Sequence, residues 1–215
     1  MQGLWPVSRA RSRLGYTLGM ANPAQRRMSI DEYLAFEETA SERHEYLDGE
    51  IFAMSGGTRA HDFLSGAVFA ELRAALRGKP CSPAASNLRV KSQVTGLYTY
   101  PDALVHCAPK FENAKETTLL NPRVIVEVLS PGTEGYDRGE KFRHYRSIPS
   151  VAEYVLVSTT DQRVEVYARR EKTWELSIHE AGQEVVLASI EVRLSVEELY
   201  RGVTLEPVPA PPVER

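Results

Sequence analysis

The stretch RVIVEVLSP, residues 123–131, has the composition of a buried β-strand but carries an acid, Glu127, at its centre. Side chains alternate between the two faces of a strand, so Glu127 shares one face with Ile125 and Leu129. Because both faces are aliphatic, this pattern predicts a buried carboxylate. Such a group is costly unless it is paired with a cation, hydrogen-bonded or bound to a metal ion, so we expect Glu127 to have a partner.

The simplest partner would be Arg123 or Arg143 in an ordinary salt bridge, and exposure of one face of the strand is the other simple interpretation. A second acid favours a functional site. Asp102 lies in YPDALV, residues 100–105, at the start of the preceding predicted strand. Pro101 has no backbone N–H and suits the first residue of a strand. If the two strands are neighbours, their carboxylates converge at one end of the sheet.

Two convergent carboxylates repel one another unless a cation lies between them, and oxygen ligands suit Mg²⁺ or Mn²⁺. Asp102 and Glu127 are therefore candidate metal ligands. A bound ion would make a coordinated water more acidic and neutralise charge on a phosphoryl oxygen, as hydrolysis of a phosphodiester requires. Lys141, on the helix expected after the Glu127 strand, could add positive charge at the phosphate, or it could be an ordinary solvated lysine.

Composition predicts one soluble domain, and the order of the expected elements, a helix, three strands, a helix and a strand, predicts an α/β core. The chain has 215 residues, of which 42% are hydrophobic, and it has no apolar run long enough to cross a membrane. Its two cysteines are too few for a disulfide framework or a metal knuckle, so a reducing cytoplasm is the expected location. Acids outnumber bases, 29 to 26, which leaves no broad basic surface for nucleic acid. DNA would need a local groove.

Residues 28–205 form the predicted domain, between an Arg-rich extension (1–27) that is disordered or wrongly assigned and a Pro-rich, disordered tail (206–215). A capping box at Ser29 and Glu32 predicts the first helix, and Asp48-Gly49 predicts a hairpin turn. Asp137 is predicted to cap a later helix, with Glu140 as its capping-box partner. The other expected elements are a helix over 61–77, strands over 88–94, 100–107, 123–131 and 152–158, a meander of 163–170, 174–180 and 184–189, and a helix over 195–203.

Five blocks of the chain together resemble the PD-(D/E)XK nuclease superfamily, and more closely the Uma-two family of bacterial proteins. The resemblance implies a restriction-endonuclease-like αβββαβ core, with a mixed central sheet and additional antiparallel strands. In order, the blocks are HEYLDGEIFAMSGGTRAH (44–61), YPDALV (100–105), VIVEVLSPGT (124–133), DRGEKFRHYRSIPSVAEYVLV (137–157) and RVEVY (163–167).

The resemblance also implies site residues. Asp102 and Glu127 occupy the positions of the metal ligands, but Leu129 stands where the superfamily pattern has lysine. Lys141 is the expected substitute, and Lys91, on the strand expected to be the first of the core, is its rival.

Two further residues match family positions. Glu45 could lend a carboxylate to the ion or its waters, or could be an exposed acid beside the hairpin. His61 could bind phosphate, hold a water or transfer a proton, or could be a hydrogen-bonded residue in the first turn of a helix.

The predicted function is that of a Mg²⁺- or Mn²⁺-dependent endonuclease that hydrolyses DNA, with the catalytic residues Asp102, Glu127, Lys141, His61 and Glu45. The alternative is a catalytically inactive nuclease-fold protein that binds or regulates a partner. Hydrolysis of a different phosphate ester is a third reading. A homodimer is also expected, because restriction-like folds often place a substrate between two subunits.

Overall fold

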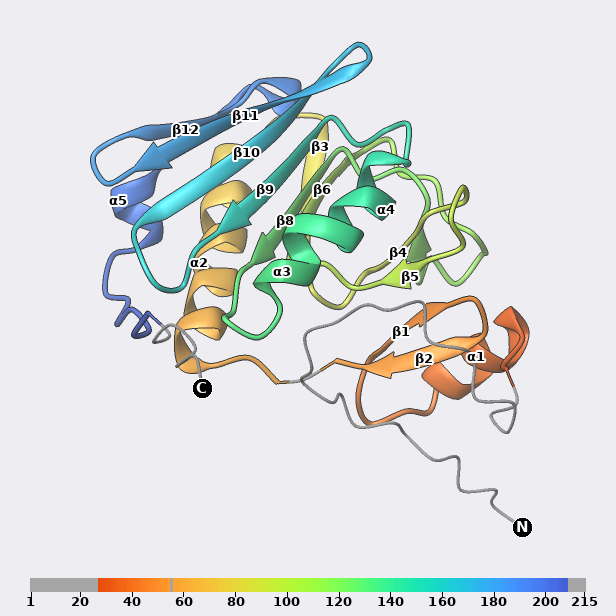
Figure 1. Cartoon of the computed structure of the whole chain (residues 1–215). Coiled ribbons are helices and arrows are strands. Elements are labelled where there is room, and N and C mark those ends of the chain that lie inside the picture. The colour runs from red at the N-terminus through yellow and green to blue at the C-terminus, as the bar shows by residue number, and fades with distance from the viewer. Residues whose placement is uncertain (1–26, 55, 209–215) are drawn as a thin grey trace.

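The computed structural model describes residues 27–54 and 56–208, and its centre is a six-stranded mixed sheet (Figure 1). Strands β8 and β9 are parallel, and every other neighbouring pair in this sheet is antiparallel. In spatial order the strands are β11 (Thr173–Glu180), β10 (Arg163–Arg170), β9 (Glu153–Val157), β8 (Val124–Val128), β6 (Ala103–Cys107) and β3 (Cys81–Ala85).

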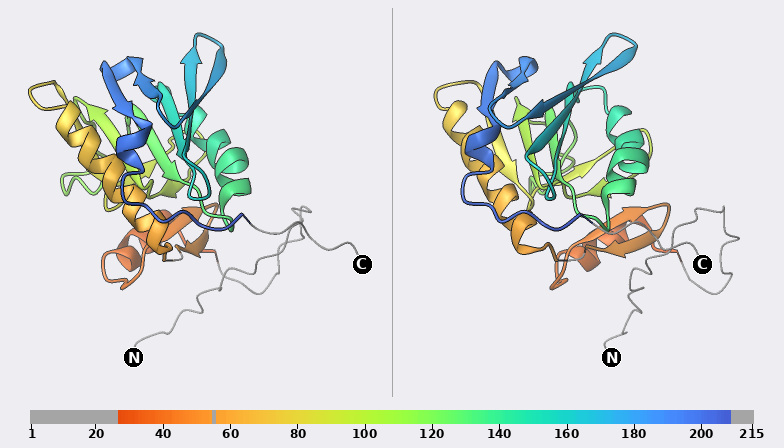
Figure 2. Two further views of the ribbon diagram at one scale, coloured as in Figure 1. Left: turned by 90° about the vertical axis from the view of Figure 1, so that its left-hand side faces the viewer. Right: turned by 60° about the vertical axis from the view of Figure 1, so that its left-hand side comes forward.

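The two faces of β8 lie in different hydrophobic clusters, as the alternation of its side chains predicts. Val126 packs with Leu64 and Leu72 of helix α2 (Arg59–Ala75), whereas Ile125 packs with Tyr145 on the opposite face. Both sides of the strand are buried. Figure 2 shows this three-layer arrangement, with α2 on one face of the sheet and the α3–α4 helical segment on the other.

The α2 face is extended by the C-terminal part of the chain. A two-stranded sheet and a short closing helix pack their buried residues into the same cluster as α2. These elements are β12 (Glu184–Leu187), the 3₁₀ turn η2 (Ala188–Ile190), β13 (Val192–Ser195) and α5 (Val196–Leu199).

The opposite face carries one continuous helical segment with a π-helical turn in its middle. It runs through α3 (Glu134–Tyr136), the π turn η1 (Asp137–Lys141) and α4 (Phe142–Arg146). Isolated π turns are uncommon and are often found at functional sites. Both Asp137 and Lys141 are buried, although they are polar.

A second sheet lies beside the end of the first, with strand order β2-β1-β5-β4-β7 (Figure 1). Helix α1 (Ile30–Glu37) begins at the predicted Ser29–Glu32 capping box. Asp48 and Gly49 have φ values of 50° and 87°, which is the left-handed geometry that the predicted tight turn requires. The strands are β1 (His44–Leu47), β2 (Glu50–Ala53), β4 (Arg89–Lys91), β5 (Tyr98–Thr99) and β7 (Thr118–Leu119).

The structure has the expected α/β class and αβββαβ core, formed by α2, β3, β6, β8, α4 and β9, but three predicted details are wrong. The strand containing Lys91 is β4 in the second sheet, and the first core strand is instead β3. Strand β12 pairs with β13 and does not continue the β10–β11 meander. Asp137 does not cap a helix, because the helical segment begins at Glu134 and Asp137 is inside it.

Strand β3 also brings the two cysteines together. Cys81 and Cys107 are direct partners in the β3–β6 register and form a disulfide, with their Cα atoms 4.3 Å apart. The sequence interpretation missed this bond because it missed β3.

The predicted tail begins too early. Glu206 is hydrogen-bonded to the folded domain. Its N–H donates to Thr159 O at 2.8 Å, and its carboxylate accepts hydrogen bonds from Thr58 and Thr159. Residues 1–26 and 209–215 lie outside the described part of the chain, so the expectations for the extension and for the rest of the tail concern residues that the structure does not describe.

Candidate active site

The two predicted metal ligands lie at the same end of adjacent strands. In the β6–β8 register Ala103 is opposite Val126, and one further step sets Asp102 opposite Glu127. Asp102 Oδ2 accepts a hydrogen bond from Val128 N at 2.7 Å, which holds this carboxylate against the end of β8. Strand pairing therefore places the acids together, as expected if the strands are neighbours.

Glu127 is buried, and its partner is a lysine. Its Oε1 lies 3.0 Å from Lys141 Nζ and accepts a hydrogen bond from Tyr145 OH at 2.6 Å. Burial raises the pKa of Glu127 well above its ordinary value, the charge of Lys141 opposes this rise, and the charge of Asp102 adds to it. Arg143 bonds to Glu140 instead, so the simple interpretation that it pairs with Glu127 is wrong.

Lys141 is surrounded by acids. In addition to Glu127, its Nζ lies 3.3 Å from Glu45 Oε1 and 3.6 Å from Asp137 Oδ1. Burial lowers the pKa of Lys141, but the surrounding carboxylates, Glu127 first, more than reverse this effect and raise it well above its ordinary value. Lys141 is thus a buried cation at neutral pH, and the solvated-lysine interpretation is wrong.

Glu45 reaches this cluster from the second sheet. It lies on β1, its Oε1 accepts a hydrogen bond from Thr99 Oγ1 at 2.5 Å, and its Oε2 accepts one from Tyr136 OH at 3.2 Å. Because Glu45 is buried, it is not an exposed acid beside a hairpin. The ion pair between Glu45 and Lys141 joins the second sheet to the helical segment that covers the central sheet.

His61 closes the other side of the cluster. It lies in the first turn of α2, and its Nε2 is 3.3 Å from Asp102 Oδ2. Burial lowers the pKa of His61, but the hydrogen bond and charge of Asp102 outweigh this effect, so the net shift is upward. The side chains of His61 and Asp102 are 21% and 14% exposed, against 4% for Glu127, so solvent reaches the cluster from this side.

The five predicted catalytic residues thus form one connected cluster, and the rival lysine lies outside it. Lys91 pairs with Glu112 and also lies near Tyr98. The sequence interpretation missed two members of the cluster, Asp137 and Tyr145. The spacing of Asp137, one helical turn before Lys141, is the signal that could have placed it.

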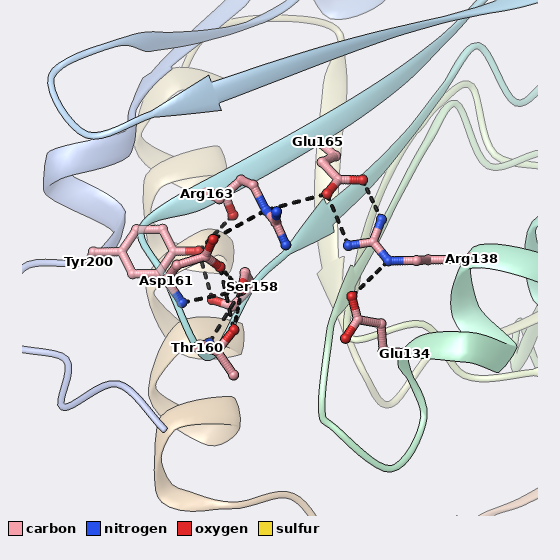
Figure 3. A network of polar contacts seen from close by, with 8 residues as sticks. All are labelled: Glu134, Arg138, Ser158, Thr160, Asp161, Arg163, Glu165 and Tyr200. Carbon is pink, nitrogen blue, oxygen red and sulfur yellow. Dashed lines mark hydrogen bonds and ion pairs between the residues drawn. The ribbon is translucent and has the colours of Figure 1, made fainter. Parts of the chain in front are cut away.

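A neighbouring ion-pair network fixes the helical segment that carries Lys141 (Figure 3). Arg138 binds Glu165 on β10 through both terminal nitrogens, and its Nε donates to Glu134 Oε1 at 2.8 Å. Arg163 lies on the other side of Glu165, at 3.4 Å. The side chain of Glu165 is only 7% exposed, so this network anchors the π turn to the central sheet.

Asp102 and Glu127 are the two carboxylates of this cluster that could contribute oxygen ligands to a hard cation. Among the residues that the structure describes, no group of three or more His, Cys, Asp or Glu side chains is arranged around a common ion position. Mg²⁺ is commonly held by only one or two carboxylates together with waters and substrate phosphates. Within the described part of the chain, the two polar contacts of Asp102 with Val128 N and His61 Nε2 both use Oδ2, which leaves Oδ1 for a further ligand.

A family model described as "Putative restriction endonuclease", Uma2, matches residues 30–197. The chain belongs to the Uma2 family. Residues Glu45, His61, Asp102, Glu127 and Lys141 all lie inside the matched range. The family assignment agrees with the resemblance in the sequence motifs.

Relatives of this Uma2 protein occur in Synechocystis sp. strain PCC 6803. Uncharacterized protein slr1290 is 38% identical over 178 residues, covering 82% of this chain and 93% of the relative. Uncharacterized protein sll1609 is 33% identical over 143 residues, covering 66% and 81%. A crystal structure from Anabaena variabilis, titled as a putative nuclease belonging to DUF820, has a TM-score of 0.66 at 16% identity and covers 82% of this chain and 99% of its own. That likeness concerns the fold alone.

The sequence predicts that no apolar segment of the chain is long enough to cross a membrane. Within residues 27–54 and 56–208, none of the helices is both long and apolar enough to cross a membrane.

Proposed function

We propose that this Uma2 protein is a Mg²⁺- or Mn²⁺-dependent endonuclease that hydrolyses DNA phosphodiester bonds. The observation that carries the proposal is the placement of Asp102 and Glu127 at the end of two adjacent strands, with the buried ammonium of Lys141 3.0 Å from Glu127. Membership of a family described as "Putative restriction endonuclease" supports the same reaction class.

In this proposal each residue has a distinct role. Asp102 and Glu127 would hold the divalent ion, which supplies an acidified water and charge neutralisation at the phosphate. Lys141 would stabilise negative charge and orient the attacking water, which is the role of the lysine that the superfamily pattern places at position 129. Glu45 fixes the position of Lys141, and His61, on the solvent side, would contact the phosphate or transfer a proton.

The test is cleavage of supercoiled plasmid DNA by the purified full-length chain, with added Mg²⁺ or Mn²⁺. We expect Asp102→Asn, Glu127→Gln and Lys141→Ala each to abolish nicking, with circular dichroism confirming the fold of every variant. Arg143→Ala is the matched control, because Arg143 lies two residues from Lys141 but pairs with the exposed Glu140. Cleavage that survives both carboxylate substitutions would assign the activity to a contaminant.

The second candidate is a nuclease-fold protein that binds a partner without cutting nucleic acid. It is favoured by the engagement of Lys141 with three carboxylates and by the acidic composition of the chain. Titration calorimetry with Mn²⁺ separates the two candidates. A nuclease should bind the ion and lose that binding in Asp102→Asn, whereas the absence of binding at millimolar Mn²⁺ would favour the second candidate.

A further inference from the structure

Strand β11 is an open edge of the central sheet. Among the described residues it pairs only with β10, and Leu176 and Ile178 on one of its faces are 46% and 51% exposed. Natural proteins usually protect such edges with proline, lysine, bulges or a covering segment, because the unpaired backbone groups can pair with another strand. The stretch Thr173–Glu180 contains neither proline nor lysine.

Backbone hydrogen bonding shows which residues of β11 direct their peptide groups outward. Arg169 N donates to Ala152 O, on the side of β9, so residues 164, 166, 168 and 170 of β10 direct their peptide groups toward β11. Their partners in the register, residues 173, 175, 177 and 179, bond back to β10. Residues 174, 176 and 178 therefore present their N–H and C=O groups to the open edge.

The edge is complementary to a second copy of itself. In an antiparallel pairing with its twofold axis at Ser177, Leu176 lies opposite Ile178 of the partner subunit, and both are outward-bonding positions. On the other face Glu175, which also contacts Arg170 of its own chain, lies opposite His179 of the partner subunit. Side chains that lie directly opposite one another are on the same face of the sheet. In this register each apolar side chain therefore faces an apolar one, and each Glu175 carboxylate faces an imidazole. The twofold axis repeats both pairs. Moving the axis to Leu176 would set Glu175 against the partner's Ser177 and lose the pairing of carboxylate with imidazole.

We propose that β11 is a homodimer interface, in which two copies of the chain pair antiparallel about Ser177 and join their central sheets into one. The outward peptide groups of residues 174, 176 and 178 and the exposed side chains of Leu176 and Ile178 are already in place for this pairing. Strands β10 and β9 separate β11 from β8 and the carboxylate cluster, so the proposed interface does not depend on the proposed nuclease activity.

The test uses the full-length chain and a cross-link that only this register allows. Ser177 lies at a non-hydrogen-bonded position of the proposed pair, where the opposing side chains are closest. We expect Ser177→Cys to form a disulfide-linked dimer rapidly under mild oxidation, while Thr173→Cys, at the far end of the same strand, stays monomeric on a non-reducing gel. The native cysteines are already paired with each other and do not compete.

Sedimentation velocity on the unmodified chain provides the second measurement. We expect a dimer at micromolar concentration and a monomer for Ile178→Lys, with unchanged circular dichroism because Ile178 is exposed. A monomeric wild-type chain, a dimer that persists in Ile178→Lys, or equal cross-linking at positions 173 and 177 would each overturn the proposal. DNA cleavage is not read out, so failure here is separate from failure of the nuclease proposal.

Discussion

Replacement of Lys141 by methionine tests whether the buried ammonium holds the carboxylate cluster together. Three carboxylates lie within 3.6 Å of Lys141 Nζ, and the exposed fractions of their side chains are between 4% and 11%. Removing one partner of a buried ion pair costs about 3–5 kcal/mol, because the remaining charge stays buried without compensation. That is a large fraction of a typical unfolding free energy of about 5–15 kcal/mol. We therefore expect the Lys141→Met substitution to lower the free energy of unfolding by about 4 kcal/mol.

The assay is urea denaturation followed by circular dichroism. With a urea slope of about 2 kcal/mol per molar, this loss lowers the unfolding midpoint by about 2 M. The double variant Lys141→Met with Glu127→Gln should recover part of the loss, since one uncompensated charge is removed. Lys172→Met, on an exposed turn, is the control and should leave the midpoint unchanged. A loss below about 1 kcal/mol would refute the inference that the buried ammonium holds the carboxylate cluster together.

A divalent ion should act in place of the missing ammonium. In Lys141→Met the carboxylates no longer have the ammonium as a partner. Added Mg²⁺ should therefore raise the free energy of unfolding more in this variant than in the wild-type chain. An ion at a concentration 100 times its Kd adds about 2.7 kcal/mol to the free energy of unfolding. Equal Mg²⁺ effects on both proteins would show that the ion does not enter this cluster.

Three further predictions concern the surroundings of the site. In Gly57→Ala the new methyl would lie 2.6 Å from His61 Nδ1, so the ring must move and plasmid nicking should fall at least tenfold with little change in urea midpoint; full activity would contradict the proposed role of His61. Glu165→Ala leaves the guanidinium of Arg138 without its main partner and should cost about 2–4 kcal/mol in the same urea assay, and a neutral result would show that the network does not anchor the π turn. Burial, and secondarily a neighbouring guanidinium, lower the pKa of His144 in the folded chain. Below a pH of about 6.5 this histidine is therefore protonated more readily in the unfolded chain than in the folded chain, and it reduces wild-type stability as the pH falls. The pH dependence of the urea midpoint between pH 7 and 5 should therefore be weaker in His144→Gln, and identical pH profiles would contradict the shift.

Local signals predict the parts of the site that lie on one strand or one helix. The burial of Glu127 follows from the alternation of five aliphatic neighbours, and its convergence with Asp102 follows from one strand pairing. The partner of Glu127 could not be read in the same way. Lys141 and Glu45 come from a helical segment and from the second sheet, and only tertiary packing brings them within 3.3 Å of each other.

The errors have physical causes as well. Strand β3, CSPAA, has no β-branched or aromatic residue and includes Pro83, so its propensity for a strand is low and only its pairing with β6 defines it. Asp137 has the spacing of a capping residue, but it lies inside a π turn, where its carboxylate faces Lys141. Tertiary context overrides local preference at both places.

The ion pair between Glu45 and Lys141 depends on docking of the β1–β2 hairpin during folding. Glu45 lies on the β1–β2 hairpin, whereas Lys141 lies in the π turn of the α3–α4 helical segment. In a chain whose β1–β2 hairpin has not docked, Lys141 lacks Glu45, one of its three acidic neighbours. If this cluster is the proposed nuclease site, the acidic surroundings of its lysine are complete only in a chain whose hairpin has docked.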